Sequence, residues 1–339
     1  MSRGNVAIFV PHVGCPHKCA FCDQRTITGQ VTIPHAADVT AACKQALSEM
    51  IDPSESEIAF FGGSFTAIDR RYMLELLGAA KEFVGGGKCK FKGIRLSTRP
   101  DCIDREVLDI LKEYGVTAIE LGAQSMDDRV LELNERGHDV KAVYDSARLI
   151  REYGFELGLQ IMTGLYGSDR ACEDKTRERV LEIRPDTVRI YPVCVLEGTR
   201  LAELYHAGEY RLMSFEEMLG ICAGDALAFT RAGIKILRIG LHASESVERD
   251  MAAGYYHPAL GELVRGRIVR DIIEKSLADC GGADSVTVFC GSGMISAAAG
   301  HKRSNKTYFA ERGVRLDTVP DGSLGSKEIR IGREVYKCI

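Results

Sequence analysis

Short apolar runs alternate with longer amphipathic segments along roughly the first two thirds of the chain. The short runs are rich in β-branched and aromatic residues and predict strands over Val6–Val10, Ile58–Phe61, Ile94–Ser97, Thr117–Leu121, Leu157–Met162 and Thr187–Tyr191. Between them, apolar residues recur at helical spacing, which predicts helices over Ala36–Met50, Arg70–Val84, Arg105–Tyr114, Val140–Tyr153 and Ala171–Ile183. Such alternation, with strands that are apolar on both faces, is typical of a parallel sheet covered by helices. We therefore predict an α/β fold, namely a partial (β/α)6 TIM-like barrel.

The pattern changes after the sixth strand. A helix over Phe215–Ala232 and a strand over Ile234–Ile239 complete the barrel, and the polar stretch Glu245–His257 marks a boundary. We predict a barrel domain over residues 1–245 and a small C-terminal α/β domain over residues 246–339. The elements expected in the smaller domain are helices over Leu260–Leu277 and Asn305–Arg312, the glycine-bounded segment Gly291–Gly300, and strands over Ser285–Phe289, Val314–Val319 and Glu328–Ile331.

Composition narrows the class of protein. Hydrophobic residues make up 45% and charged residues 27% of the 339 positions, as in an ordinary soluble globular protein. No stretch approaches the length of a membrane span, and the N-terminal apolar run is too short for a signal peptide. Twelve cysteines without a secretory signal favour a reducing compartment. We expect a cytoplasmic protein with no membrane partner.

Three of the cysteines, Cys15, Cys19 and Cys22, follow the spacing CxxxCxxC. Three thiolates on one short loop can hold a four-iron cluster and leave one iron open to another ligand. A zinc site and three unconnected cysteines are the alternatives, but zinc loops usually pair one CxxC with a second pair of ligands, which this chain lacks. The other nine cysteines, such as Cys89 and Cys172, show no ligand spacing, and most should be buried as small apolar side chains.

Glycine and polar residues stand where the predicted strands end, which is where a barrel of parallel strands places its chemistry. Gly62, Gly63 and Ser64 follow the second strand, and the two glycines permit either a simple tight turn or a close approach to a ligand. Further polar residues at the ends of the next three strands are Ser97, Gln124 and Gln160.

The cysteine loop, the run Glu120–Ser125 (ELGAQS) and Arg136–His138 (RGH) together resemble the radical S-adenosylmethionine superfamily. The resemblance is closest to the radical domain of the Elongator catalytic subunit, more distant to the oxygen-independent coproporphyrinogen oxidases, and covers about residues 5–240. It implies a [4Fe–4S] cluster on the three cysteines, with S-adenosylmethionine chelated to the open iron. The cluster would donate one electron and yield methionine and a 5′-deoxyadenosyl radical, which abstracts hydrogen from the substrate. An external electron donor such as flavodoxin or ferredoxin is implied as well.

The same resemblance assigns cofactor contacts. Gln124 would hydrogen-bond the ribose of S-adenosylmethionine, and Arg136 would pair with its carboxylate. The turn at residues 62–64 takes the place of a GGE-like turn that contacts the amino group, with a serine in place of the acidic residue. Ser97 joins the cofactor-binding set. Gln160 stands where relatives place a second ribose contact, although a polar side chain satisfied within the protein is an equal alternative.

Tyr191 and Cys194 lie where a substrate would enter, and they are the candidates for direct chemistry, with packing as the alternative role. Two features depart from the Elongator pattern. The residues after 245 are too few for the acetyl-coenzyme A domain of those subunits, and the cysteines are more closely spaced than theirs. We expect an Elongator-like radical domain without its acetyltransferase domain, so acetyl-coenzyme A chemistry does not carry over.

The C-terminal part differs in charge from the rest. Residues 259–339 hold 13 Lys and Arg against 10 Asp and Glu, a net charge of +3, whereas residues 1–258 have a net charge of −7. The densest basic run, His301–Lys306, contains Lys302, Arg303 and Lys306 and adjoins the glycine-bounded segment. This arrangement is loosely similar to a KH-type RNA module, which clamps nucleic-acid backbone with a glycine-bounded loop. A plain cap on the barrel and a protein-binding surface are the alternatives.

Taken with the resemblance, these features predict a radical S-adenosylmethionine enzyme that acts on tRNA or another structured RNA. One alternative is a radical enzyme that acts on a small molecule or a peptide. Another is a non-catalytic iron–sulfur RNA-binding factor, which would not release 5′-deoxyadenosine.

Overall fold

The computed structural model describes residues 5–11, 15, 19–23, 32–85, 90–242 and 245–339. The chain divides into two compact units. The first comprises residues 1–212 and 242–254, and the second comprises residues 213–241 and 255–339. Within the described residues, no helix is long and apolar enough to cross a membrane.

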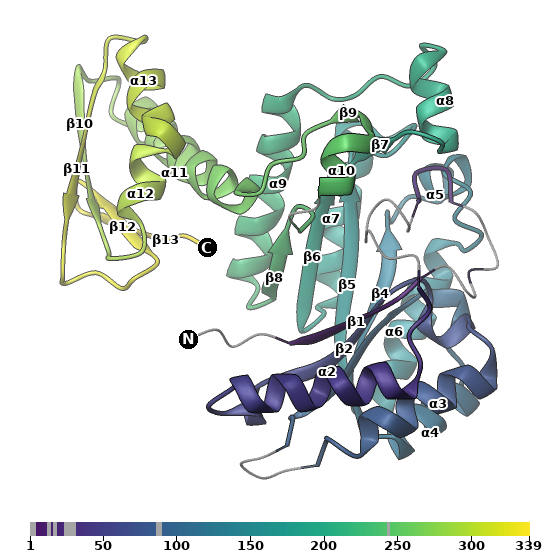
Figure 1. Cartoon of the computed structure of the whole chain (residues 1–339). Helices are drawn as coiled ribbons and strands as arrows, with labels where there is room; N and C mark the ends of the chain where they lie inside the picture. Colours follow the sequence, from purple (N-terminus) through teal and green to yellow (C-terminus); the bar gives the residue numbers. More distant parts are fainter. Residues whose placement is uncertain (1–4, 12–14, 16–18, 24–31, 86–89, 243–244) are drawn as a thin grey trace. The chain divides into compact units, whose positions relative to one another are not determined.

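A parallel sheet forms the centre of the first unit (Figure 1). Its strands lie side by side in chain order: β1 (Val6–Val10), β2 (Glu57–Gly62), β3 (Gly93–Thr98), β4 (Val116–Gln124), β5 (Glu156–Thr163) and β6 (Thr187–Pro192). The sheet curls into a half-barrel, and the helices that connect its strands are α2 (Ala36–Glu49), α3 (Arg70–Lys81), α4 (Arg105–Glu113), α5 (Asp128–Leu133), α6 (Val140–Glu152) and α7 (Arg170–Ile183). The predicted α/β partial barrel is confirmed.

Smaller elements complete this unit. Strand β7 (Cys194–Leu196) pairs with β9 (Met251–Gly254) in an antiparallel ribbon, and the short helices are α8 (Arg200–His206) and α10 (Glu245–Asp250). Aspartates fix the starts of several helices, because each side chain accepts hydrogen bonds from backbone N–H groups of the first turn; they are Asp69, Asp104, Asp127, Asp139 and Asp169.

The two faces of the sheet differ in polarity. The outer face is apolar, and its fully buried side chains include Ile58, Phe60, Leu96 and Ile119. The inner face instead carries charged residues that are at most 5% exposed: Glu57, Arg95 and Glu120. The expectation that the strands are apolar on both faces is therefore wrong. Buried charges are tolerated at these positions because they pair with one another across neighbouring strands.

The second unit contains a mixed four-stranded sheet in the order β11-β10-β12-β13. Strands β10 (Ser285–Cys290) and β11 (Arg315–Pro320) run parallel, while β12 (Glu328–Ile331) pairs antiparallel with both β10 and β13 (Glu334–Lys337). The other elements of the unit are α9 (Phe215–Arg231), β8 (Lys235–Ile239), α11 (Leu260–Asp279), α12 (Ile295–Ala299) and α13 (Ser304–Ala310). The sequence did not predict α12 within its glycine-bounded segment, nor β13.

The division between the units differs from the predicted boundary at residue 245. Strand β8 follows β6 in the order of the seven-stranded sheet, as expected, whereas compactness groups β8 and helix α9 with the C-terminal residues. Contacts within the second unit explain this grouping. Glu216 of α9 accepts hydrogen bonds from Arg267 and Arg270 of α11, and Phe215 packs against Tyr255.

Candidate cofactor site

The cysteine segment is anchored through its backbone. The N–H of Ala20 donates to the carbonyl of Asn134 at 3.1 Å, and the N–H of Leu201 donates to the carbonyl of Ala20 at 2.8 Å. Cys15, Cys19 and Cys22 are all free of disulfides, and residues 16–18 lie outside the described part of the chain. Among the residues that the structure describes, no three His, Cys, Asp or Glu side chains are grouped to hold a metal ion.

Two buried guanidinium groups face the sulfur of Cys19. Arg136 Nη1 lies 3.1 Å from Cys19 Sγ, and Arg99 Nη1 lies 4.0 Å from the same atom. Cys19 is 8% exposed, Arg136 6% and Arg99 3%, so water screens these charges weakly. A sulfur flanked by cations in a buried site is the environment that suits an anionic thiolate ligand.

The end of β4 brings Gln124 and Arg136 together. Gln124 has a φ of 64° at an irregularity in the β4–β5 register, and its Oε1 is buried with no hydrogen-bond partner among the described residues. The same holds for Arg136 Nε, while Arg136 Nη2 donates to the carbonyl of Gly122 at 2.5 Å. A Cβ on Gly122 would lie 2.9 Å from Gln124 Nε2, so a larger residue at this position would displace the end of the Gln124 side chain.

These unpaired atoms test whether the residues fit a bound cofactor. A buried polar atom without a partner costs free energy unless a ligand or water satisfies it. Gln124 offers a hydrogen-bond acceptor, Arg136 offers a cationic donor, and the Cys19 sulfur lies beside that donor. This donor set fits a ligand with hydroxyl and carboxylate groups held next to a thiolate-bound cluster.

The turn after β2 has a structural role of its own. Gly62 has a φ of +117°, and a Cβ at this position would lie 2.4 Å from the carbonyl oxygen of Val10. Gly63 donates its N–H to the same oxygen at 3.0 Å. Glycine at position 62 therefore lets the ends of β1 and β2 pair closely. Ser64 is buried and accepts a hydrogen bond from the Cys15 thiol, with a Sγ–Oγ distance of 3.7 Å, so it contacts the cysteine segment directly.

Ser97 and Gln160 belong to a polar network on the inner face of the barrel. Gln160 Nε2 donates to Ser97 Oγ at 3.0 Å and to Glu120 Oε2 at 2.9 Å. Arg189 donates to both oxygens of Glu120, at 2.7 and 3.1 Å. Gln160 Nε2 thus has two acceptors within the protein. For its amide nitrogen, Gln160 therefore follows the alternative prediction, in which a polar side chain makes its hydrogen bonds within the protein.

Arg95 extends this network toward the amino ends of the strands, because Glu57 and Glu156 are the first residues of β2 and β5. It donates to Glu57 at 2.7 Å, to Glu156 at 2.6 Å and to Glu120 at 3.5 Å. Sequence reasoning missed these residues, although charged side chains inside otherwise apolar strands were a visible signal. They fix the inner wall, because a paired carboxylate and guanidinium leave each other few orientations.

The two candidates for direct chemistry lie in different surroundings. Tyr191, on β6, is close enough to Arg189 to affect the pKa of its guanidinium. Burial acts to lower this pKa, but Tyr191 and Glu120 outweigh burial and raise it. Cys194, on β7, is buried, and burial raises the pKa of its thiol to about 12. Cys194 is therefore a protonated thiol at neutral pH. Direct chemistry by Tyr191 or Cys194 stays a prediction.

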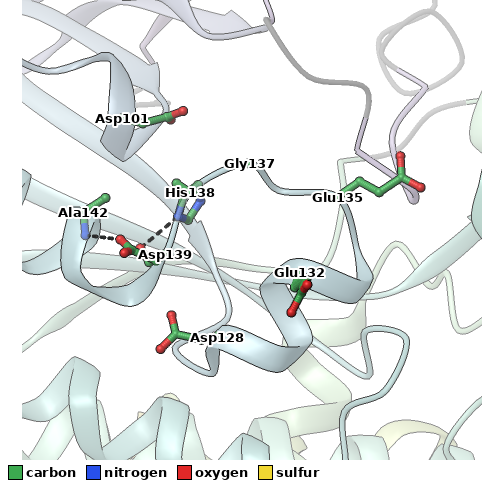
Figure 2. Close-up of a pocket in the computed structure, with 8 residues that line it drawn as sticks. All are labelled: Asp101, Asp128, Glu132, Glu135, Gly137, His138, Asp139 and Ala142. Atoms are coloured by element: carbon green, nitrogen blue, oxygen red, sulfur yellow. Dashed lines mark hydrogen bonds between the residues drawn. The ribbon is translucent and has the colours of Figure 1, made fainter.

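An acidic cleft of about 760 Å³ lies next to Arg136 in the chain (Figure 2). Its lining residues are Asp101, Asp128, Glu132, Glu135, Gly137, His138, Asp139 and Ala142. His138 is buried, its Nδ1 lies 3.2 Å from the carbonyl oxygen of Asp139, and its Nε2 has no partner among the described residues. Burial, with a smaller contribution from Arg136, lowers the pKa of His138 to about 4. The imidazole is neutral at physiological pH.

The basic run of the second unit forms a separate feature. Lys302 and Arg303 are exposed and adopt left-handed backbone conformations, with φ angles of 50° and 66°. Lys306 follows on α13 and is half-buried. Left-handed conformations are uncommon for residues other than glycine, asparagine and aspartate. Within the described residues, no salt bridge joins these three side chains to an acid.

Comparison with known proteins gives consistent results. A model of the Radical SAM superfamily matches residues 9–180, and a model of the Radical_SAM C-terminal domain matches residues 185–270. The tRNA uridine(34) acetyltransferase of Dehalococcoides mccartyi is 27% identical over 307 residues, which cover 81% of this chain and 65% of that protein. Elongator complex protein 3 of Homo sapiens is 34% identical over 185 residues, which cover 52% of this chain and 32% of that protein.

Among solved structures, Elp3 of Methanocaldococcus infernus with an N-terminal deletion has a TM-score of 0.63 at 22% identity, over 84% of this chain and 64% of that one. This likeness shows the fold. The chain spans about half to two thirds of the length of the tRNA uridine(34) acetyltransferases that it matches. Because the superfamily model matches half of its residues, the chain belongs to the radical SAM superfamily, whose members use a [4Fe–4S] cluster and S-adenosylmethionine.

Proposed function

We propose that this protein reductively cleaves S-adenosylmethionine at the carboxyl end of β4 and uses the reaction to modify tRNA. One observation carries the first half of the proposal. The unpaired oxygen of Gln124, the guanidinium of Arg136 and the sulfur of Cys19 belong to one buried cluster where β4 ends. S-adenosylmethionine carries a carboxylate, an amino group and ribose hydroxyls, which match these groups.

Each residue then has a defined task. Cys15, Cys19 and Cys22 would hold the cluster, and Arg136 would bind the cofactor carboxylate through Nε, the donor that is buried without a partner among the described residues. Gln124 would accept a hydrogen bond from the ribose through its unpaired oxygen. The carbonyl of Gln160 is aimed by Glu120 and would accept a second one. When bound, the cluster and S-adenosylmethionine supply one-electron chemistry, for which a flavodoxin or ferredoxin would be the electron source.

The second half of the proposal rests on the relatives and on charge. Proteins named tRNA uridine(34) acetyltransferase match most of this chain. The exposed Lys302 and Arg303, together with Lys306, offer cations without acidic partners in the described structure. Cations of this kind bind a phosphate backbone through charge and counterion release. Acetyl transfer is not part of the proposal.

Cofactor cleavage is tested by anaerobic incubation of the cluster-loaded protein with S-adenosylmethionine and dithionite. We expect release of 5′-deoxyadenosine, measured by liquid chromatography. Arg136→Ala should slow the release, and Arg105→Ala, which removes an exposed guanidinium paired with Glu152 on the surface, should not. A cluster-loaded protein that releases no 5′-deoxyadenosine would be a binding factor, and the enzymatic proposal would then be wrong.

The substrate is tested separately. Total tRNA from cells that lack this chain is incubated with the protein, S-adenosylmethionine and dithionite, and its nucleosides are analysed by mass spectrometry. We expect a nucleoside of altered mass in tRNA treated with the active protein and none with Arg136→Ala. Cleavage of the cofactor with unaltered tRNA nucleosides would reject the tRNA substrate and favour a small molecule or peptide.

A further inference from the structure

Arg99 is a buried residue whose side chain is fixed by several hydrogen bonds. Its Nε and Nη2 donate to the two oxygens of Asp101, each at 2.9 Å, and Nη2 also donates to the backbone carbonyl of Arg136. Arg99 is 3% exposed and directly precedes the η3 turn (Pro100–Cys102) that follows β3. This bidentate pairing leaves Nη1 as the part of the guanidinium that faces the cysteine segment.

Nη1 of Arg99 is directed at the same sulfur as Arg136. The two nitrogen–sulfur distances are 4.0 Å from Arg99 and 3.1 Å from Arg136. The guanidinium group of arginine stays charged in proteins. Cys19 is the residue of the cysteine segment against which both guanidinium groups lie.

A cation beside a cluster ligand affects electron uptake. A cluster becomes more negative when it accepts an electron, so a nearby positive charge stabilises the reduced form more than the oxidised form. Hydrogen bonds to cluster sulfurs and local charge are among the factors that set the reduction potential. The effect is large in a buried site, where solvent screens charge weakly.

We propose that Arg99 is a positioning residue that holds Arg136 through its backbone carbonyl and raises the reduction potential of a cluster ligated by Cys19. The proposal rests on the proposed function, because it assumes a cluster on the three cysteines. Asp101 has the opposite effect, since its carboxylate pairs with Arg99 and partly neutralises its charge. The positive charge of Arg99, reduced by the negative charge of Asp101, would set the reduction potential of the cluster.

The test is a potentiometric titration of the cluster-loaded protein without S-adenosylmethionine, monitored by electron paramagnetic resonance. Arg99→Leu should lower the ratio of reduced to oxidised cluster about tenfold at a given potential, a shift of about 59 mV for a one-electron couple. Arg99→Lys keeps the charge and should stay within about threefold of the wild type. Arg105→Leu, a surface control on α4, should leave the ratio unchanged.

Asp101→Asn keeps the test decisive if Arg99→Leu fails to fold or to take up the cluster. It removes a negative charge at a partly exposed side chain, so it should raise the ratio of reduced to oxidised cluster. If neither the Arg99 nor the Asp101 variants move the midpoint, the inference is overturned while the proposed function stands. If the wild-type protein takes up no cluster, the proposed function itself fails, and the two failures are therefore distinguishable.

Discussion

The buried arginines beside Cys19 in the first unit and the basic run of the second unit are held in opposite ways. In the first unit, Arg99 and Arg136 are buried, and hydrogen bonds to carboxylate, carbonyl and sulfur acceptors fix both side chains. In the second unit, Lys302 and Arg303 are exposed, and within the described structure no ion pair fixes them. The positive charges of the first group are therefore fixed in orientation, whereas those of the second are exposed to solvent.

This difference indicates two kinds of ligand. A guanidinium whose orientation is fixed in a buried site recognises one geometry, as a carboxylate or a cluster ligand requires. Exposed cations act through charge that salt screens, and they tolerate many positions of a polyanion. The first unit suits a small cofactor of fixed shape, and the second suits a flexible or extended anion. Variants that affect the two units differently can break or sharpen this comparison.

The largest effect is expected for the cysteine segment. Replacing Cys15, Cys19 or Cys22 by Ala should abolish the brown visible absorption of the reconstituted protein, because a four-iron cluster needs all three thiolates of this loop. Iron and sulfide analysis measures the loss. Cys43→Ala is the matched control, because Cys43 is fully buried in α2 and lies outside the CxxxCxxC segment, so this variant should keep the chromophore. Retention of the cluster in any of the three variants would contradict the assignment.

The next effect concerns pH and the buried His138. Its pKa in the folded protein is about 4, below the ordinary 6.5, so the unfolded chain binds the proton more readily between these values. The stability that comes from the neutral imidazole is complete above about pH 6.5 and is lost as the pH falls toward 4. The free energy of unfolding should fall by roughly 3 kcal/mol more in the wild type than in His138→Gln over this window.

Urea unfolding at a series of pH values measures this difference. His206→Gln is the control, because His206 is exposed and contacts Glu197 on the surface. If the free energy of unfolding depends on pH equally in the wild type and in His138→Gln, protonation of His138 does not affect stability and the prediction is wrong. The second unit offers no buried histidine of this kind among the described residues, so the effect sharpens the contrast between the units.

The sequence predicted much of the first unit, for a physical reason. Its strands and helices have long, regular apolar patterns, and the structure places β1 over the predicted Val6–Val10 and α2 within one residue of its predicted end. The polar inner wall escaped prediction, because Arg95, Glu120 and Arg189 are paired only after distant strands come together. No local pattern indicates that charges so far apart in the chain neutralise one another.

The candidate site shows the same division. Cys19, Gln124 and Arg136 came from motifs, and the structure brings Arg136 against Cys19 and against the backbone beside Gln124. Their contacts to the cofactor stay a prediction. Arg99 was not predicted as part of the site, because its importance depends on contacts with residues about 40 and 80 positions away in the chain. The strained conformation of Gln124 likewise becomes visible only in the folded chain.

A smaller effect is expected for the cofactor contacts. Arg136→Ala should weaken binding of S-adenosylmethionine by about 1.5–3 kcal/mol, the usual range for a hydrogen bond to a charged group. Gln124→Ala should weaken it by about 0.5–1.5 kcal/mol, because a neutral hydrogen bond is lost. Anaerobic calorimetry on cluster-loaded protein measures both, with Arg105→Ala as the control. Unchanged binding in both variants would show that the cofactor does not contact the end of β4.

Changes in the basic run of the second unit, Lys302, Arg303 and Lys306, should have the smallest effect on the chemistry of the first unit. Replacing Lys302, Arg303 and Lys306 together by Ala should weaken tRNA binding and flatten the slope of log K against log salt by about 2–3 units, because fewer counterions are released. Cofactor cleavage without RNA should continue at its original rate, since these side chains belong to the other unit.

Filter binding over a range of salt concentrations measures the slope, and replacement of the exposed Lys327, Arg333 and Lys337 is the charge-matched control. An equal loss in both triple variants would show that net charge alone acts. An unchanged slope in the first would exclude this run from the RNA site and break the comparison on which it rests.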